Sequence, residues 1–231
     1  MNGSRVAAPR AVLAWGFGVA GLVLYNWWVL VLFRPSLLRS PNELFSNLEV
    51  TGQPYATEMQ HADLISGVLF VLAFLAVGWW SLHGGLREWV SMVVFGVAAA
   101  LGGLFPETCP DEISSACKAQ EWHFQLSIQE YLHVVAGIAE FGAITVALVF
   151  AYQRTRGHSG RIPATYRGLM LGAVIAYPGL AVAYLFNVAG SIVEGIFFIG
   201  FTITIVIQLR ERTHRDPLDA AMAVPGAVSS P

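Results

Sequence analysis

The stretch YLHVVAGIAEFGAITVALVFAY, residues 131–152, decides the fold class of this chain. Apart from His133, the only acidic or basic residue in this stretch is Glu140. A helix that crosses a membrane needs about 20 mainly apolar residues, because the hydrocarbon core is about 30 Å thick and a helix rises about 1.5 Å per residue. The stretch therefore predicts a membrane-spanning helix.

Five more stretches have the same apolar character. Together they predict six spans, at roughly residues 11–33, 63–82, 89–104, 131–152, 166–186 and 190–209. The spans are predicted as helices, since open strands cannot satisfy their backbone polar groups in lipid and the apolar runs lack β-barrel alternation. A signal peptide is the alternative for the first span, but its apolar run is longer than an h-region and no cleavage site follows.

The composition agrees with a membrane protein. Of the 231 residues, 55% are hydrophobic and 12% are charged, with a mean hydropathy of +0.59. Soluble domains carry about 25% charged residues. The net charge of −2 and the lack of basic blocks argue against a nucleic-acid partner.

The arginines predict the orientation of the spans. Most of them lie on four segments that the positive-inside rule places in the cytoplasm, namely Arg5, Arg10, Arg87, Arg154, Arg156, Arg161, Arg167, Arg210, Arg212 and Arg215. Arg34 and Arg39 oppose this orientation and are outnumbered. We therefore predict one six-helix domain, residues 1–216, with both termini cytoplasmic. Residues 217–231, rich in Ala, Pro, Ser and Gly, predict a disordered cytoplasmic tail.

The two cysteines, Cys109 and Cys117, both lie in the connection that is predicted to be outside the cytoplasm. Because that compartment is oxidising, they predict a disulfide. A thiol metal site or a redox pair are the alternatives. The spacing fits no close-spaced redox motif, and one pair is too few for structural zinc.

Several ionisable residues are predicted to converge on the outer side. Asp63 opens the second span, Glu107 lies in the cysteine loop, and Glu130 and His133 begin the fourth span. Glu130, His133 and Glu140 lie on nearly one stripe of that helix, which would place Glu140 about 15 Å deep.

Charged residues inside the spans are the main functional candidates. Each costs at least about 2.5 kcal/mol to insert, so such side chains usually face a bundle interior or a wet cavity. We predict an outward-open polar funnel lined by Asp63, Glu107, His133, Glu140 and Glu194. The alternative is that these groups pair across helices and only fix the packing.

A divalent metal such as zinc is one predicted occupant, with Asp63, Glu107, Glu130 and His133 as ligands, because imidazole with carboxylate suits zinc. Glu130 and His133 also have the Glu-x-x-His spacing of di-iron bundles, which need two such motifs and two further glutamates on facing helices. Six tryptophans lie mostly near predicted helix ends and indicate an interfacial belt. They are Trp27, Trp28, Trp79, Trp80, Trp89 and Trp122.

Segments on the predicted outer side resemble a known family. The segments LFSNLEVTGQP (44–54), HADLISG (61–67) and FPETC (105–109), followed by Cys117, Ser127 and His133, resemble the bacterial membrane family called domain of unknown function 998. The resemblance implies a small multi-pass bundle in a bacterial plasma membrane. Its matching positions here are Asp63, Pro106, Cys109, Cys117 and His133. The family usually carries an acid just before the first loop cysteine, where this chain has Thr108.

Three functions fit the sequence. The first is a membrane-embedded enzyme, such as a metal-assisted hydrolase, acting on a lipid or isoprenoid-type substrate. Its predicted catalytic residues are Asp63 and His133 as ligand or base, Glu140 as acid, and Glu194. The second is a non-catalytic component that binds a membrane lipid or a membrane partner protein. The third, transport of protons or small solutes, finds little support in the cytoplasmic half beyond Ser81 and His83, and no transporter-type repeat is detectable.

Overall fold

The structure is a computed structural model that describes residues 8–38, 42–78, 85–109, 114–156, 161–186 and 188–213. The helices of this part are α1 (Ala8–Tyr25), α2 (Leu30–Phe33), α3 (Ala56–Val77), α4 (Leu86–Leu104), α5 (Ser115–Trp122), α6 (Ile128–Thr155), α7 (Arg161–Phe186) and α8 (Gly190–Thr213). Three short 3-10 helices are η1 (Trp27–Val29), η2 (Pro35–Leu37) and η3 (Phe45–Glu49). The predicted tail at 217–231, as well as Trp79, Trp80, Ser81 and His83, lies outside the described residues.

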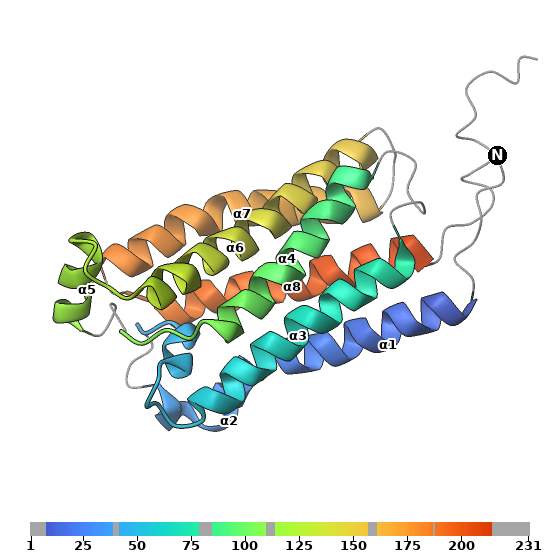
Figure 1. The fold of residues 1–231 in the computed structure, drawn as a ribbon. Coiled ribbons are helices and arrows are strands. Elements are labelled where there is room, and N and C mark those ends of the chain that lie inside the picture. The colour runs from blue at the N-terminus through green and yellow to red at the C-terminus, as the bar shows by residue number, and fades with distance from the viewer. Residues whose placement is uncertain are drawn as a thin grey trace, which may run out of the picture.

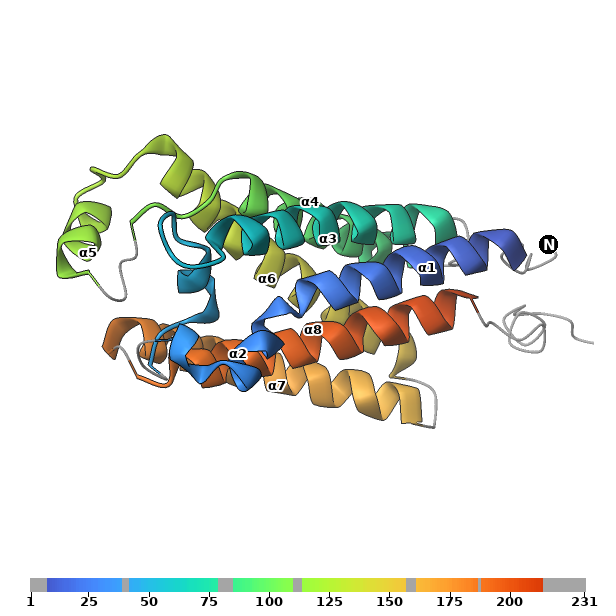
Figure 2. The same cartoon turned by 90° about the horizontal axis from the view of Figure 1, so that it is seen from below.

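The six long helices α1, α3, α4, α6, α7 and α8 run side by side in one elongated bundle (Figures 1 and 2). Among the described residues, α3, α4, α6 and α8 are long and apolar enough to cross a membrane, and α1 is a shorter apolar helix. Apolar side chains such as Val12, Leu72, Ile138, Ile175 and Ile199 are exposed on the bundle. An apolar exterior is what a lipid environment requires, so the predicted fold class of a helical membrane bundle is confirmed.

The two ends of the bundle carry different features. One end holds α5 and α2, while α1 begins and α8 ends at the other (Figure 1). We call them the disulfide end and the terminal end. The predicted disulfide is confirmed at the first of these, where Cys109 beyond α4 is bonded to Cys117 on α5.

The first predicted span is not one continuous helix. α1 ends at Tyr25, and the Asn26 side-chain amide donates to the Leu22 carbonyl (2.8 Å) and to Thr202 Oγ1 (3.1 Å). Such side-chain bonds compete with helical backbone bonds. The turn directs Trp27 and Trp28 inward, and each is only 7% exposed. The prediction of an interfacial belt is therefore wrong for these two residues.

α3 and α4 approach each other closely at three glycines. A Cβ at Gly67 would lie 2.3 Å from the Ala100 nitrogen, and one at Gly96 would lie 2.9 Å from the Gly67 oxygen. At Gly103 it would lie 2.4 Å from the Gln60 oxygen. Small residues at helix contacts let two backbones come together in lipid, where association depends on packing.

Aromatic side chains fill the centre of the bundle. The Tyr25 ring packs edge-on against Phe70, Phe95 and Phe198, with centroid distances of 5.6, 5.8 and 5.2 Å. Phe201 extends the cluster to Phe95 and Phe198. These rings join α1, α3, α4 and α8 into one core between the two ends of the molecule.

Candidate functional site

Four carboxyl groups come together inside the bundle towards the disulfide end. Asp63 lies on α3, Glu140 on α6, Glu194 on α8 and Glu49 on η3. Each lies close enough to the other three to interact electrostatically. We call this set the carboxyl cluster. Three of its members, Asp63, Glu140 and Glu194, are predicted site residues, whereas the sequence analysis did not identify Glu49.

Hydrogen-bond donors from neighbouring elements hold three of the four acids. The Trp27 indole N–H donates to Asp63 Oδ1 at 2.8 Å, and the Tyr25 hydroxyl donates to Glu140. The backbone N–H of Phe45 donates to Glu194. Among the described residues, no Lys, Arg or His forms an ion pair with any of the four acids. The cluster is thus stabilised by neutral donors instead of cations.

The carboxyl groups of Glu49 and Asp63 are neighbours within the cluster. Burial raises the pKa of Glu49 well above its ordinary value, and the negative charge of Asp63 raises it further. Glu49 therefore keeps its proton to a higher pH than a carboxyl group in water does.

The segment that carries Glu49 folds back into the bundle. Phe45, Leu48 and Val50 are buried together with Glu49, and η3 contacts α3 and α8. Asn47 is 1% exposed, and its side-chain amide has no hydrogen-bond partner in the described structure. The apolar residues that flank Glu49 in the sequence could have indicated that this segment is buried, because a loop in water does not require them.

His133 is turned away from the carboxyl cluster. Its Nδ1 lies 2.9 Å from the Phe105 carbonyl oxygen and 3.3 Å from that of Gly102. Both carbonyls belong to the end of α4, where the last turn of a helix leaves carbonyl oxygens without helical partners. As an N–H donor, His133 therefore caps α4 and fixes it to α6.

Glu130 and Glu107 serve the loop that contains the disulfide. Glu130 is buried at the start of α6, and its Oε2 accepts from the backbone N–H (2.8 Å) and the hydroxyl (2.7 Å) of Thr108. The Glu107 carbonyl accepts from the Thr51 N–H at 3.1 Å. These bonds attach the cysteine loop to α6 and to the first loop.

The predicted metal ligands are not assembled. Among the described residues, no three His, Cys, Asp or Glu side chains lie close enough to hold a metal ion. Asp63, Glu130 and His133 all lie towards the disulfide end, as their positions in the sequence predicted. Each side chain, however, contacts a different partner. The geometry thus gives the zinc hypothesis no ligand set.

A pocket of about 440 Å³ lies beside the carboxyl cluster at the disulfide end. Its walls are mostly apolar, and they come from α2, η2 and the first turns of α3. They are formed by Trp27, Leu30, Phe33, Arg34, Leu37, Tyr55, Glu58, Met59 and Ala62. Trp27 connects the two features, because it lines the pocket and also donates its indole N–H to Asp63.

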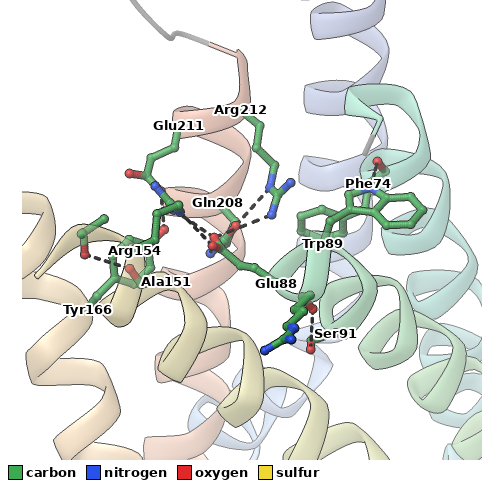
Figure 3. Close-up of polar contacts among 12 residues, drawn as sticks. Phe74, Glu88, Trp89, Ser91, Ala151, Arg154, Tyr166, Gln208, Glu211 and Arg212 are labelled. Atoms are coloured by element: carbon green, nitrogen blue, oxygen red, sulfur yellow. Dashed lines mark hydrogen bonds and ion pairs between the residues drawn. The ribbon is translucent and has the colours of Figure 1, made fainter. Parts of the chain in front are cut away.

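A second polar site lies at the terminal end (Figure 3). Glu88 on α4 is 1% exposed and lies between Arg154 of α6 and Arg212 of α8. Arg154 Nε is 2.9 Å from Glu88, and Arg212 Nη2 is 3.6 Å from it. Gln208 also donates to Glu88. Sequence analysis missed this group because Arg154 and Arg212 resemble ordinary charges that flank a span.

The same network extends to α7. Arg154 Nη2 lies 2.8 Å from Glu211, and the Tyr166 hydroxyl donates to Glu211 at 2.6 Å. We call Glu88, Arg154, Tyr166, Gln208, Glu211 and Arg212 the ion-pair network. The prediction that this half of the bundle holds few polar residues is therefore wrong, whereas the other argument against transport, the lack of a transporter-type repeat, is unaffected.

The bundle, the carboxyl cluster within it and the ion-pair network define a helical membrane protein with polar groups buried in both halves. The chain belongs to the family described as Protein of unknown function (DUF998), whose model matches residues 17–211. This confirms the resemblance seen in the sequence, and the matched range includes both polar sites except Arg212. Neither a curated protein nor a solved structure is significantly similar to the chain.

Proposed function

We propose that this protein binds a membrane lipid in the pocket at the disulfide end. The lining of the pocket carries this proposal, because Trp27, Leu30, Phe33, Leu37 and Met59 offer an apolar surface beside a few polar groups. Sites for small apolar ligands have this character, with volumes of about 300–1,000 Å³. The pocket volume of about 440 Å³ falls in that range.

The surroundings of the pocket favour a lipid over a soluble ligand. Leu30 and Phe33 line it and are also strongly exposed on the outside of the bundle. An acyl chain could therefore enter sideways from the bilayer. The arginine distribution predicts that the disulfide end faces outward, so the proposed lipid belongs to the outer leaflet of a plasma membrane.

Filling the pocket tests the proposal. In Ala62→Trp the indole would occupy the space beside Trp27, and native mass spectrometry of the detergent-purified protein should show the loss of bound lipid. Leu37→Trp fills the pocket from η2 and should have the same effect. Val68→Trp is the control, because Val68 is exposed on the same helix α3 and does not line the pocket. Equal lipid binding by all four proteins would refute the proposal.

Catalysis on the bound lipid is the second candidate function. The hydrogen bond from Trp27 to Asp63 favours it, since it joins the pocket to the carboxyl cluster. In this version Asp63, Glu140 and Glu194 supply acid and base groups, whereas His133 positions α4. Purified protein would be incubated with a lipid extract and the products followed by mass spectrometry. Products that vanish in Asp63→Asn while lipid still binds would support an enzyme, and no product from the wild type would exclude it.

A further inference from the structure

We infer that the pocket selects a zwitterionic lipid of the phosphoethanolamine type, with Arg34 binding the phosphate and Glu58 binding the ammonium group. This inference rests on the proposed lipid-binding function and names the headgroup that the same pocket takes. Three observations support it: the two charged side chains on the rim of the pocket, the hydrogen-bonding groups that they leave available, and the backbone conformation of Tyr55.

The rim carries one positive and one negative side chain that do not pair with each other. Arg34 follows α2, and Glu58 lies in the first turn of α3. Both line the pocket and both are exposed. In the described part of the chain, no ion pair joins them. An apolar cavity with two separate opposite charges at its mouth matches a ligand that carries both charges and an apolar tail.

Arg34 retains most of its hydrogen-bonding capacity. Its Nη1 donates to the Tyr55 hydroxyl at 3.0 Å, which is the one hydrogen bond of its guanidinium group in the described structure. A guanidinium group has five N–H donors in a planar fork that fits phosphate oxygens in pairs. The Tyr55 contact holds the side chain at the pocket, and the remaining donors are available to a phosphate.

Glu58 suits a primary ammonium group. It has no hydrogen bond or ion pair among the described residues, and it lies in the first turn of α3. An ammonium group offers three N–H donors to a carboxylate. A trimethylammonium group offers none, so a choline headgroup would satisfy Arg34 but not Glu58. A phosphoglycerol headgroup brings only negative charge to Glu58.

The backbone at Tyr55 adds an independent sign of a binding site. Tyr55 has a φ of 66° just before α3 begins, in the left-handed region that non-glycine residues rarely adopt. Strained residues of this kind gather at ligand clamps and functional sites. Here the strained residue is the one that holds Arg34 on the rim.

Native mass spectrometry of the delipidated full-length protein tests the inference. Three phospholipids with identical acyl chains would be compared: phosphatidylethanolamine, phosphatidylglycerol and phosphatidylcholine. We expect the wild type to bind the ethanolamine lipid about tenfold more tightly than the other two. Glu58→Gln should abolish that preference, whereas Arg34→Gln should weaken binding of all three. Glu121→Gln, a carboxylate on α5 outside the pocket, is the control and should retain the preference.

The outcomes separate the inference from the function on which it rests. A wild type that binds all three lipids equally overturns the inference and leaves lipid binding intact. A preference that persists in Glu58→Gln also overturns it. A wild type that binds no lipid overturns both proposals. Glycerophosphoethanolamine, the headgroup without acyl chains, should not bind, and binding as tight as that of the whole lipid would show a soluble ligand instead.

Discussion

Two adjacent glycines on α4 should respond oppositely to the same substitution. Gly102 and Gly103 both lie in the last turn of this helix, so an alanine at either position should gain about 0.5–1 kcal/mol from its better helix propensity. The surroundings differ. A Cβ at Gly102 meets nothing within 4 Å, whereas one at Gly103 would lie 2.4 Å from the Gln60 oxygen and 2.5 Å from the Leu64 nitrogen.

The two atoms that oppose a Cβ at Gly103 belong to the backbone of α3 and cannot rotate away. Gly103→Ala must therefore push α3 and α4 apart, and overpacking of this kind costs about 1–3 kcal/mol. The cost exceeds the propensity gain, so we expect Gly103→Ala to be less stable than the wild type by about 1 kcal/mol or more. Gly102→Ala should be as stable as the wild type or slightly more stable.

Thermal unfolding in detergent, followed by intrinsic tryptophan fluorescence, measures this difference. For a chain of this size, 1 kcal/mol corresponds to about 2–4 °C in Tm. Equal Tm values for the two variants would refute the close approach of α3 and α4. A higher Tm for Gly103→Ala would refute it more strongly, since only propensity would then be acting.

Three further predictions concern stability. Glu88→Gln should destabilise the protein by about 3–5 kcal/mol, because it leaves the buried Arg212 without its carboxylate, whereas Arg210→Gln on the exposed surface should have little effect on Tm. Replacing Cys109 and Cys117 by serine should cost about 2–3 kcal/mol, and the wild type should lose the same amount in a reductant that generates free thiols. The raised pKa of Glu49 means that its contribution to stability is full below pH 4.5 and is lost as the pH rises through the folded-state pKa. Tm should therefore fall less with increasing pH in Glu49→Gln than in the wild type, and parallel curves would contradict the burial of this group.

Features that depend on residues close together in the chain could be predicted from the sequence. The apolar runs predicted the long helices, since length and hydropathy alone decide whether a segment fits a bilayer. The disulfide followed from two cysteines in one short loop on one side of the membrane. Asp63, Glu140 and Glu194 could be selected because a charge inside a span must find a polar environment.

Only the tertiary structure decided which partners those side chains meet. Glu49 enters the carboxyl cluster because η3 folds into the bundle, where the Phe45 N–H donates to Glu194. His133 leaves the predicted metal set because the end of α4 presents unsatisfied carbonyl oxygens beside it. These contacts join segments far apart in the chain, and no local pattern encodes them.

The end of α1 at Tyr25 illustrates the same difference between what the sequence and what the tertiary structure determine. The sequence determined that residues 11–33 are apolar enough to enter a membrane, but the helix ends where Asn26 finds Thr202 on α8. That contact turns Trp27 towards Asp63 and shapes the wall of the pocket. Hydropathy therefore determined that this chain is a membrane protein, whereas the packing of distant helices decided where its polar groups and its pocket lie, because buried donors and acceptors must find partners wherever the fold places them.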